Sequence, residues 1–158
     1  MNDAGEFNIE HYALEDALPY LLNRAGVRIG EAFSTELAKF SLTLPMWRVL
    51  ASLLSHDGQR MSGLAEHTSI DISTLSRLVA VLEKKRLVSR RQAEDDRRSV
   101  QVFLSAKGND LAQRIAPLAD LYERVALAGI PPDEVAMIKR HLRQIFNNIS
   151  SLGVPGGR

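Results

Sequence analysis

The stretch that decides the fold is residues 61–104, MSGLAEHTSIDISTLSRLVAVLEKKRLVSRRQAEDDRRSVQVFL. Residues 61–68 have the pattern of a short helix, and residues 69–71 form a tight connection in which Asp71 can cap the next helix. A short helix, a three-residue turn and an amphipathic helix together form a helix-turn-helix. The second helix carries apolar residues at offsets of 0, 3, 4 and 7, which make one stripe: Leu75, Leu78, Val79 and Leu82.

Two short segments rich in β-branched residues follow this helix, at residues 87–91 and 99–104. A polar loop at residues 94–98 separates them, and this arrangement predicts a β-hairpin. A basic hairpin after a helix-turn-helix makes the motif winged.

Helical patterns flank the winged region on both sides. Before it, we expect helices over residues 19–40 and 43–55, the second capped by Thr43. After it, Ser105 caps a long helix to about residue 128, and a last helix carries apolar residues over 135–149. The predicted fold class is therefore mainly α with a small β-hairpin wing.

Composition narrows the class of protein. With 158 residues and 45% apolar residues, the chain suits one domain, or one domain plus dimerisation helices. It has no cysteine, which excludes disulfides, thiolate metal sites and a redox-sensing thiol. The first twenty residues lack Lys and Arg, unlike a signal peptide, and no apolar run approaches the ~20 residues of a membrane span. We therefore expect a soluble, cytoplasmic protein without a membrane partner.

The charge is unevenly placed along the chain. The net charge is only +1, yet residues 73–98 hold eight bases against four acids, and residues 1–36 hold seven acids against two bases. A local basic block indicates a surface that binds a polyanion. A solvated charged face is the alternative explanation.

The second helix of a helix-turn-helix fits the DNA major groove with its N-terminal residues nearest the bases. Hydroxyls there can bind phosphates or base edges, and an arginine can bind guanine, although helix capping is another use for the hydroxyls. On the hairpin, Arg90 would attract phosphates, and Arg97 or Arg98 would contact DNA unless they are merely solvated. The candidates on the second helix are Ser73, Thr74, Ser76 and Arg77.

Over residues 44–112 the chain resembles the winged-helix core of the MarR family of bacterial transcriptional regulators. The resemblance implies a homodimer that binds a palindromic operator, usually as a repressor that an organic ligand releases. It implies a DNA-binding domain over residues 43–104, a helical dimerisation region over 1–42 and 105–150, and a flexible tail over 151–158. The matching segments are LPMWRVL (44–50), SGLAE (62–66), LSRLV (75–79), LEKK (82–85), LVSRR (87–91), DDRR (95–98) and LSAKG (104–108).

Two further expectations follow from the resemblance. In the wing, Asp96 would brace Arg98, and either Arg97 or Arg98 would enter the minor groove, where arginine reads groove width and negative potential. The family usually has glycine where this chain has Arg86. Either Arg86 adopts a positive φ at some cost in stability, or the helix before it ends differently.

The resemblance also implies an effector cavity between the dimerisation helices and the winged domain. Arg24 and Arg28 lie one helical turn apart beside an apolar stripe, a setting that suits an anionic aromatic ligand such as an aromatic acid or its thioester. Interhelical or intersubunit salt bridges to the N-terminal acids are the alternative. Phe33, Trp47 and His56 are weaker candidates to line this cavity.

Other classes of function find little support. The four histidines lack metal-ligand spacing, and no nucleophile, dinucleotide or phosphate-loop motif occurs, so we expect no metal, no cofactor and no enzyme activity. One rival is a winged-helix module that contacts proteins, or binds DNA structurally, without an effector. Another is a small-molecule-binding or catalytic domain, which would have to work without the basic hairpin.

Overall fold

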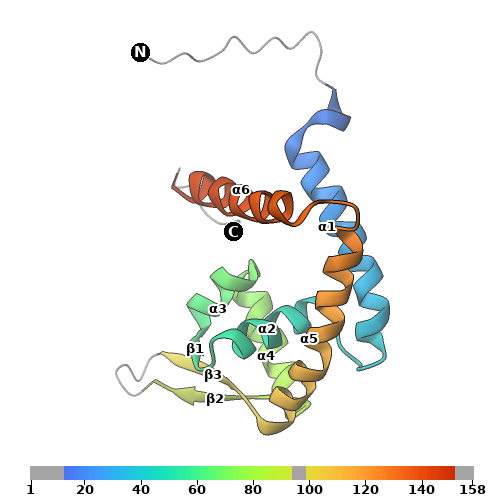
Figure 1. Cartoon of the computed structure of the whole chain (residues 1–158). Coiled ribbons are helices and arrows are strands. Elements are labelled where there is room, and N and C mark those ends of the chain that lie inside the picture. Colours follow the sequence, from blue (N-terminus) through green and yellow to red (C-terminus); the bar gives the residue numbers. More distant parts are fainter. Residues whose placement is uncertain (1–12, 94–98, 152–158) are drawn as a thin grey trace.

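The computed structural model describes residues 13–93 and 99–151. In this part the chain is mainly helical, with one small antiparallel sheet (Figure 1). The predicted fold class is therefore confirmed. The elements in chain order are a 3₁₀ turn at Leu14–Asp16, α1 (Leu18–Ala38), α2 (Leu44–Ser55), β1 (Gln59–Arg60), α3 (Met61–Thr68), α4 (Ile72–Lys84), β2 (Val88–Gln92), β3 (Val100–Leu104), α5 (Ala106–Ala126) and α6 (Pro132–Ser150).

The three predicted helix caps are present. The Thr43 hydroxyl accepts a hydrogen bond from the Met46 N–H at 3.4 Å, at the start of α2. The Asp71 carboxylate accepts one from the Thr74 N–H at 2.9 Å, at the start of α4. The Ser105 hydroxyl accepts one from the Gly108 N–H at 2.9 Å, at the start of α5. Each cap satisfies a backbone donor that the first helical turn leaves open.

The sheet has the strand order β1-β3-β2, and both pairings are antiparallel. The predicted hairpin pairs Arg90 of β2 with Val102 of β3. On its other side, Val102 pairs with Gln59 of β1. The sequence analysis did not predict β1, because two residues are too short to show an alternating pattern. Only the pairing with β3 makes them a strand.

The core lies where the winged region meets those ends of α1 and α5 that are lower in Figure 1. In α4 the predicted stripe faces it, with Leu75, Val79 and Leu82 fully buried and Leu78 half-buried. Helix α2 packs on α1, α3, α4 and α5, so it is the central helix of this core. Its buried side chains include Leu50 and Leu53.

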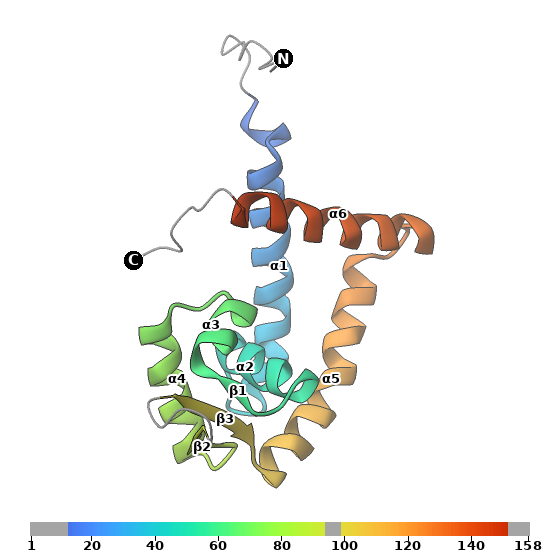
Figure 2. The same ribbon diagram turned by 90° about the vertical axis from the view of Figure 1, so that its left-hand side faces the viewer.

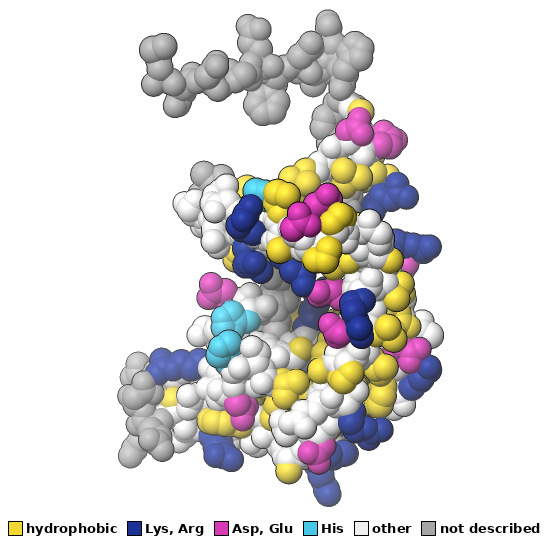
Figure 3. All heavy atoms as spheres, viewed as in Figure 1, with side chains coloured by type: hydrophobic (Ala, Val, Ile, Leu, Met, Phe, Trp, Pro, Cys, Tyr) yellow, Lys and Arg dark blue, Asp and Glu magenta, His cyan; other side chains and the backbone are white. Residues whose placement is uncertain are grey.

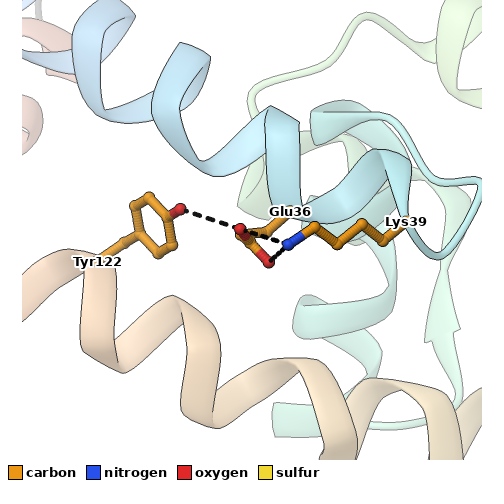
Figure 4. Close-up of polar contacts among 3 residues, drawn as sticks. All are labelled: Glu36, Lys39 and Tyr122. Carbon is orange, nitrogen blue, oxygen red and sulfur yellow. Dashed lines mark hydrogen bonds and ion pairs between the residues drawn. The ribbon is translucent and has the colours of Figure 1, made fainter.

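Helices α1 and α5 lie side by side below the point where the chain turns into α6 (Figures 1 and 2). Polar and aromatic contacts join them. The Tyr122 hydroxyl donates to Glu36 Oε1 at 3.5 Å, and the Lys39 ammonium donates to both Glu36 oxygens at 2.9 and 2.8 Å (Figure 4). The bond to Glu36 raises the pKa of Lys39. The Tyr122 ring also lies 5.4 Å from that of Phe33, so this seam fixes α5 against α1.

Helix α6 lies above the winged region and buries none of its residues in the described chain (Figures 1 and 2). Large apolar side chains on α6 and on the upper part of α1 are therefore exposed. They comprise Met137, Ile138, Leu142, Phe146 and Ile149 on α6, and Leu18, Leu21, Leu22, Val27 and Ile29 on α1. None of the described helices is long and apolar enough to cross a membrane.

Arg86 adopts a left-handed conformation, with φ at +59°. This settles the two alternatives for the end of α4 in favour of a positive φ. The Arg86 N–H donates to the Glu83 carbonyl at 2.8 Å, and the Leu87 N–H donates to the Leu82 carbonyl at 2.9 Å. The Arg86 carbonyl accepts a bond from the Ser105 hydroxyl at 2.7 Å. These bonds hold a conformation that glycine would adopt without strain.

Candidate nucleic-acid interface

The N-terminal turns of α4 present an exposed surface of hydroxyls and one arginine. Ser73, Thr74, Ser76 and Arg77 are all exposed. Within the described chain, Arg77 has no hydrogen-bond or ion-pair partner, and α4 holds no acid before Glu83. A phosphate or a base edge can therefore approach the Arg77 guanidinium without displacing a protein partner.

Ser73 is engaged in the helix cap. Its hydroxyl donates to Asp71 Oδ1 at 2.6 Å, while the Thr74 N–H donates to the same oxygen. Hydrogen bonds, first from Ser73 and then from Thr74, hold the pKa of Asp71 well below its usual range. The capping explanation therefore accounts for Ser73, whereas Ser76 makes no side-chain hydrogen bond within the described residues and keeps its hydroxyl available.

Asp71→Ala should lower the melting temperature, because it removes the acceptor for both the Ser73 hydroxyl and the Thr74 N–H. Asp71→Asn should retain most of the stability, since asparagine also caps helices. The folded-state pKa is depressed, so the advantage of wild type over Asp71→Ala should be complete at pH 7. It should shrink as the pH falls below about 4, the ordinary carboxyl range. Thermal unfolding at several pH values tests this, and a gap between the two proteins that is independent of pH would contradict it.

Arg90 is tied to the end of α4. Its backbone N–H donates to Glu83 Oε1 at 3.1 Å, its Nε donates to Oε2 at 2.8 Å, and its Nη2 lies 2.6 Å from Oε2. The bond from Arg90 lowers the pKa of Glu83. The pair joins the recognition helix to the first wing strand. The sequence analysis missed Glu83, because its partner lies seven residues away on another element.

Glu83→Ala and Arg90→Ala should each weaken DNA binding by a similar factor, because either change frees the wing from α4. A double-mutant cycle on stability should show a coupling of roughly 1 kcal/mol, since the ion pair is partly exposed. DNA affinity by fluorescence anisotropy and unfolding by urea provide the two measurements. If Arg90 instead acts only by contacting phosphate, Arg90→Ala will weaken DNA binding while Glu83→Ala leaves it unchanged or strengthens it.

The predicted wing-tip residues lie outside the described residues. These are Asp96, Arg97 and Arg98, so the predicted brace and the minor-groove contact stay predictions. Strands β2 and β3 lie on the same side of the molecule as α4 (Figure 2).

Two pockets flank helix α2 and share one side chain, that of Arg48. The α1–α2 pocket, of about 610 Å³, is lined by Leu22, Asn23, Gly26, Val27, Gly30, Glu31, Ser34, Leu44 and Arg48. The α2–α3 pocket, of about 680 Å³, is lined by Trp47, Arg48, Ala51, Ser52, Ser55, His56, His67, Thr68 and Ser69.

The structure separates the predicted effector residues. Trp47 and His56 line the α2–α3 pocket, while Phe33 is buried with its ring centroid 6.0 Å from that of Trp47. Arg24 and Arg28 line neither pocket. Arg24 lies over the Tyr20 ring at 5.4 Å, and Arg28 pairs with Glu31 at 3.2 Å. This ion pair lies within α1, so it is not the interhelical or intersubunit pair of the alternative, which stays a prediction.

Arg48 was missed by the sequence analysis. It follows Leu44 and precedes Ser52 at intervals of four residues, so the three share one face of α2. That spacing could have pointed to it. Within the described chain, no hydrogen bond or ion pair engages its guanidinium.

A helix-turn-helix followed by a β-hairpin is the winged helix-turn-helix arrangement, which is a DNA-binding motif. Residues 42–100 match the model of the MarR family. This match covers the winged region and agrees with the resemblance to transcriptional regulators that the sequence indicated. The family and the relatives below are regulators rather than enzymes, which agrees with the sequence analysis.

Individual relatives cover most of the chain. The transcriptional repressor IacR of Pseudomonas putida is 26% identical over 144 residues, which are 90% of this chain and 86% of that protein. A MarR-family regulator from Silicibacter pomeroyi has a TM-score of 0.79 and 29% identity, covering 87% of this chain and 92% of that one. CouR from Rhodococcus jostii RHA1, solved bound to p-coumaroyl-CoA, has a TM-score of 0.77 and 25% identity, covering 85% and 95%.

Proposed function

We propose that the chain is a homodimeric repressor that binds a palindromic DNA operator and is released by a small organic effector. The observation that carries the DNA-binding part is the exposed, unpaired Arg77 on the N-terminal half of α4. Ser76 and Thr74 would contact base edges or phosphates beside it. Arg97 and Arg98 would add contacts from the wing tip, with Asp96 as their brace.

The dimer is supported by the exposed apolar side chains of α1 and α6. Monomeric proteins rarely expose such contiguous apolar surface, because burying it against a partner is favourable. A twofold dimer through these helices would carry two α4 helices. We expect them to read half-sites about 10 bp apart, one turn of B-DNA.

The effector would occupy the α1–α2 pocket. Leu22, Val27 and Leu44 provide apolar walls there, and Arg48 provides a cation. This combination suits an aromatic acid or its thioester, and CouR was solved with a ligand of the thioester type. The proposal assigns the anion-binding role to Arg48 rather than to Arg24 or Arg28, since neither of these lines a pocket.

Selection from randomised duplexes tests the DNA-binding proposal. We expect enrichment of an inverted repeat and elution of the protein as a dimer. If about eight phosphates are neutralised, the logarithm of the binding constant should fall against the logarithm of salt concentration with a slope near −7. A protein that stays monomeric, or that enriches no sequence at low salt, would refute the proposal.

A thermal-shift screen of aromatic acids and their thioesters tests the effector proposal, because a ligand that binds the folded state raises the melting temperature. Arg48→Ala should lose the shift and keep DNA binding, whereas Arg28→Ala should keep both. If Arg28→Ala loses the shift and Arg48→Ala keeps it, the anion-binding role belongs to Arg28. If no compound gives a shift while DNA binding persists, the chain is a winged-helix DNA-binding module without an effector.

A further inference from the structure

The α2–α3 pocket has the chemistry of an anion site, and it shares Arg48 with the effector pocket proposed above. Its lining contains Arg48, His56 and His67, together with three serines and Thr68, and it contains no Asp or Glu. Every charged or titratable side chain that lines the pocket is therefore a base. Figure 3 shows histidine side chains on this face below Lys and Arg side chains, with Asp or Glu side chains beside them.

The hydrogen bonds around the pocket leave its outer nitrogens available. The Gln59 amide nitrogen donates to the Ser52 carbonyl at 2.8 Å and to the His56 carbonyl at 2.7 Å. Gln59 Oε1 is therefore an acceptor, and His67 Nδ1 donates to it at 2.7 Å. His56 Nδ1 lies 3.1 Å from the Ser55 hydroxyl. Both rings thus engage Nδ1, and no hydrogen bond within the described residues involves either Nε2.

Arg48 completes this arrangement because it lies on the wall common to both pockets. Its five N–H donors have no partner within the described residues. An oxyanion in the α2–α3 pocket could accept from this guanidinium and, when the imidazoles are protonated, from Nε2 of His56 and His67.

The pocket also includes residues of the helix-turn-helix. Thr68 and Ser69 form the end of α3 and the turn into α4, and Ser69 has φ at +52°. A ligand in this pocket would contact the helix-turn-helix directly. The α1–α2 pocket, in contrast, borders α1 and the first turn of α2.

We propose that the α2–α3 pocket is a second ligand site, which takes the phosphate or carboxylate group of a small metabolite through Arg48, His56 and His67. The site goes beyond the proposed effector pocket, and His56 and His67 distinguish it, because they line the α2–α3 pocket and not the α1–α2 pocket. A ligand in this site reaches the turn before α4, so the ligand acts on the helix-turn-helix rather than on the dimerisation helices.

Trp47 provides the test, because it lines the pocket and is the only tryptophan in the chain. Inorganic pyrophosphate and benzoate are titrated separately into the full-length protein at constant ionic strength. Trp47 fluorescence and the ring C–H resonances of His56 and His67 are followed by fluorimetry and NMR. We expect a saturable change in both signals with at least one anion. Saturation with pyrophosphate alone assigns a phosphate group, and saturation with benzoate alone assigns a carboxylate.

Variants distinguish the site from general attraction of anions. Arg48→Ala should weaken binding at least about tenfold, the effect of losing a charge-assisted hydrogen bond. His56→Gln/His67→Gln should weaken it severalfold, and circular dichroism should show that this variant stays folded. Arg124→Ala removes one cation from exposed α5 and should change nothing.

Two results would overturn the proposal: neither anion saturates, or the histidine variant binds as wild type does. DNA selection is measured without either anion. A failure of this site would therefore leave the proposed DNA-binding function standing, and a failure of that function would leave this site standing.

Discussion

Arg77→Ala should weaken binding to the selected operator by about 100-fold or more. One bidentate contact between arginine and guanine contributes about 1–3 kcal/mol, and a twofold dimer loses two such contacts. Arg77 is suited to this role because it is exposed on α4 and no described residue neutralises it. Fluorescence anisotropy with a labelled operator, at one fixed salt concentration, measures the loss.

Arg124→Ala provides the matched control, because it removes the same charge from an exposed helix whose arginine pairs with Asp120. It should bind the operator within about twofold of wild type, as expected for a charge far from the DNA. Arg77→Lys should recover attraction to phosphates and lose discrimination between bases, since lysine lacks the planar fork of donors. Wild-type affinity in Arg77→Ala would show that α4 is not the reading helix.

Gly108→Ala should destabilise the fold by about 3 kcal/mol, the upper part of the range for overpacking. A Cβ at Gly108 would lie 1.9 Å from the Leu87 carbonyl oxygen and 2.8 Å from its carbon. Both atoms belong to the backbone, so no side chain can rotate away. The Leu87 carbonyl also accepts from the Ser105 N–H at 3.0 Å, and therefore α5 cannot shift without straining the bond that joins its N-cap to the α4–β2 connection. Urea unfolding measures the change.

Gly63→Ala is the control for this substitution. Gly63 lies in helix α3, and a Cβ there would meet nothing within 4 Å. Alanine should stabilise the protein slightly, by about 0.5–1 kcal/mol, because it restricts the unfolded chain. Equal stability of Gly108→Ala and wild type would mean that α5 does not pack against Leu87 as the structure has it.

Local patterns were enough to predict most of the fold. The stripe from Leu75 to Leu82 and the caps Thr43, Asp71 and Ser105 are properties of neighbouring residues, so they can be recognised in the sequence. The prediction of a positive φ at Arg86 as one alternative came from the family resemblance, and the structure selected it.

The candidate sites were harder to predict than the fold. Arg77 could be placed on the exposed face of α4 because its exposure follows from helical periodicity. The ion pair of Arg90 could not be predicted, since its partner Glu83 belongs to another element. The same limit applies to the pockets, where Arg48 lies on the wall common to both and Arg24 and Arg28 lie outside them.

By itself, the sequence of this chain determined the order of its helices and hairpin, the side of α4 that is buried, and the class of regulator that it resembles. Only the tertiary structure decided that Gln59 and Arg60 form a strand, that Arg90 is held by Glu83, and that Arg48 joins two pockets. The physical reason is the range of the interactions. Helix periodicity and capping act over three to four residues, whereas strand pairing, ion pairs between elements and pocket walls depend on how distant segments pack.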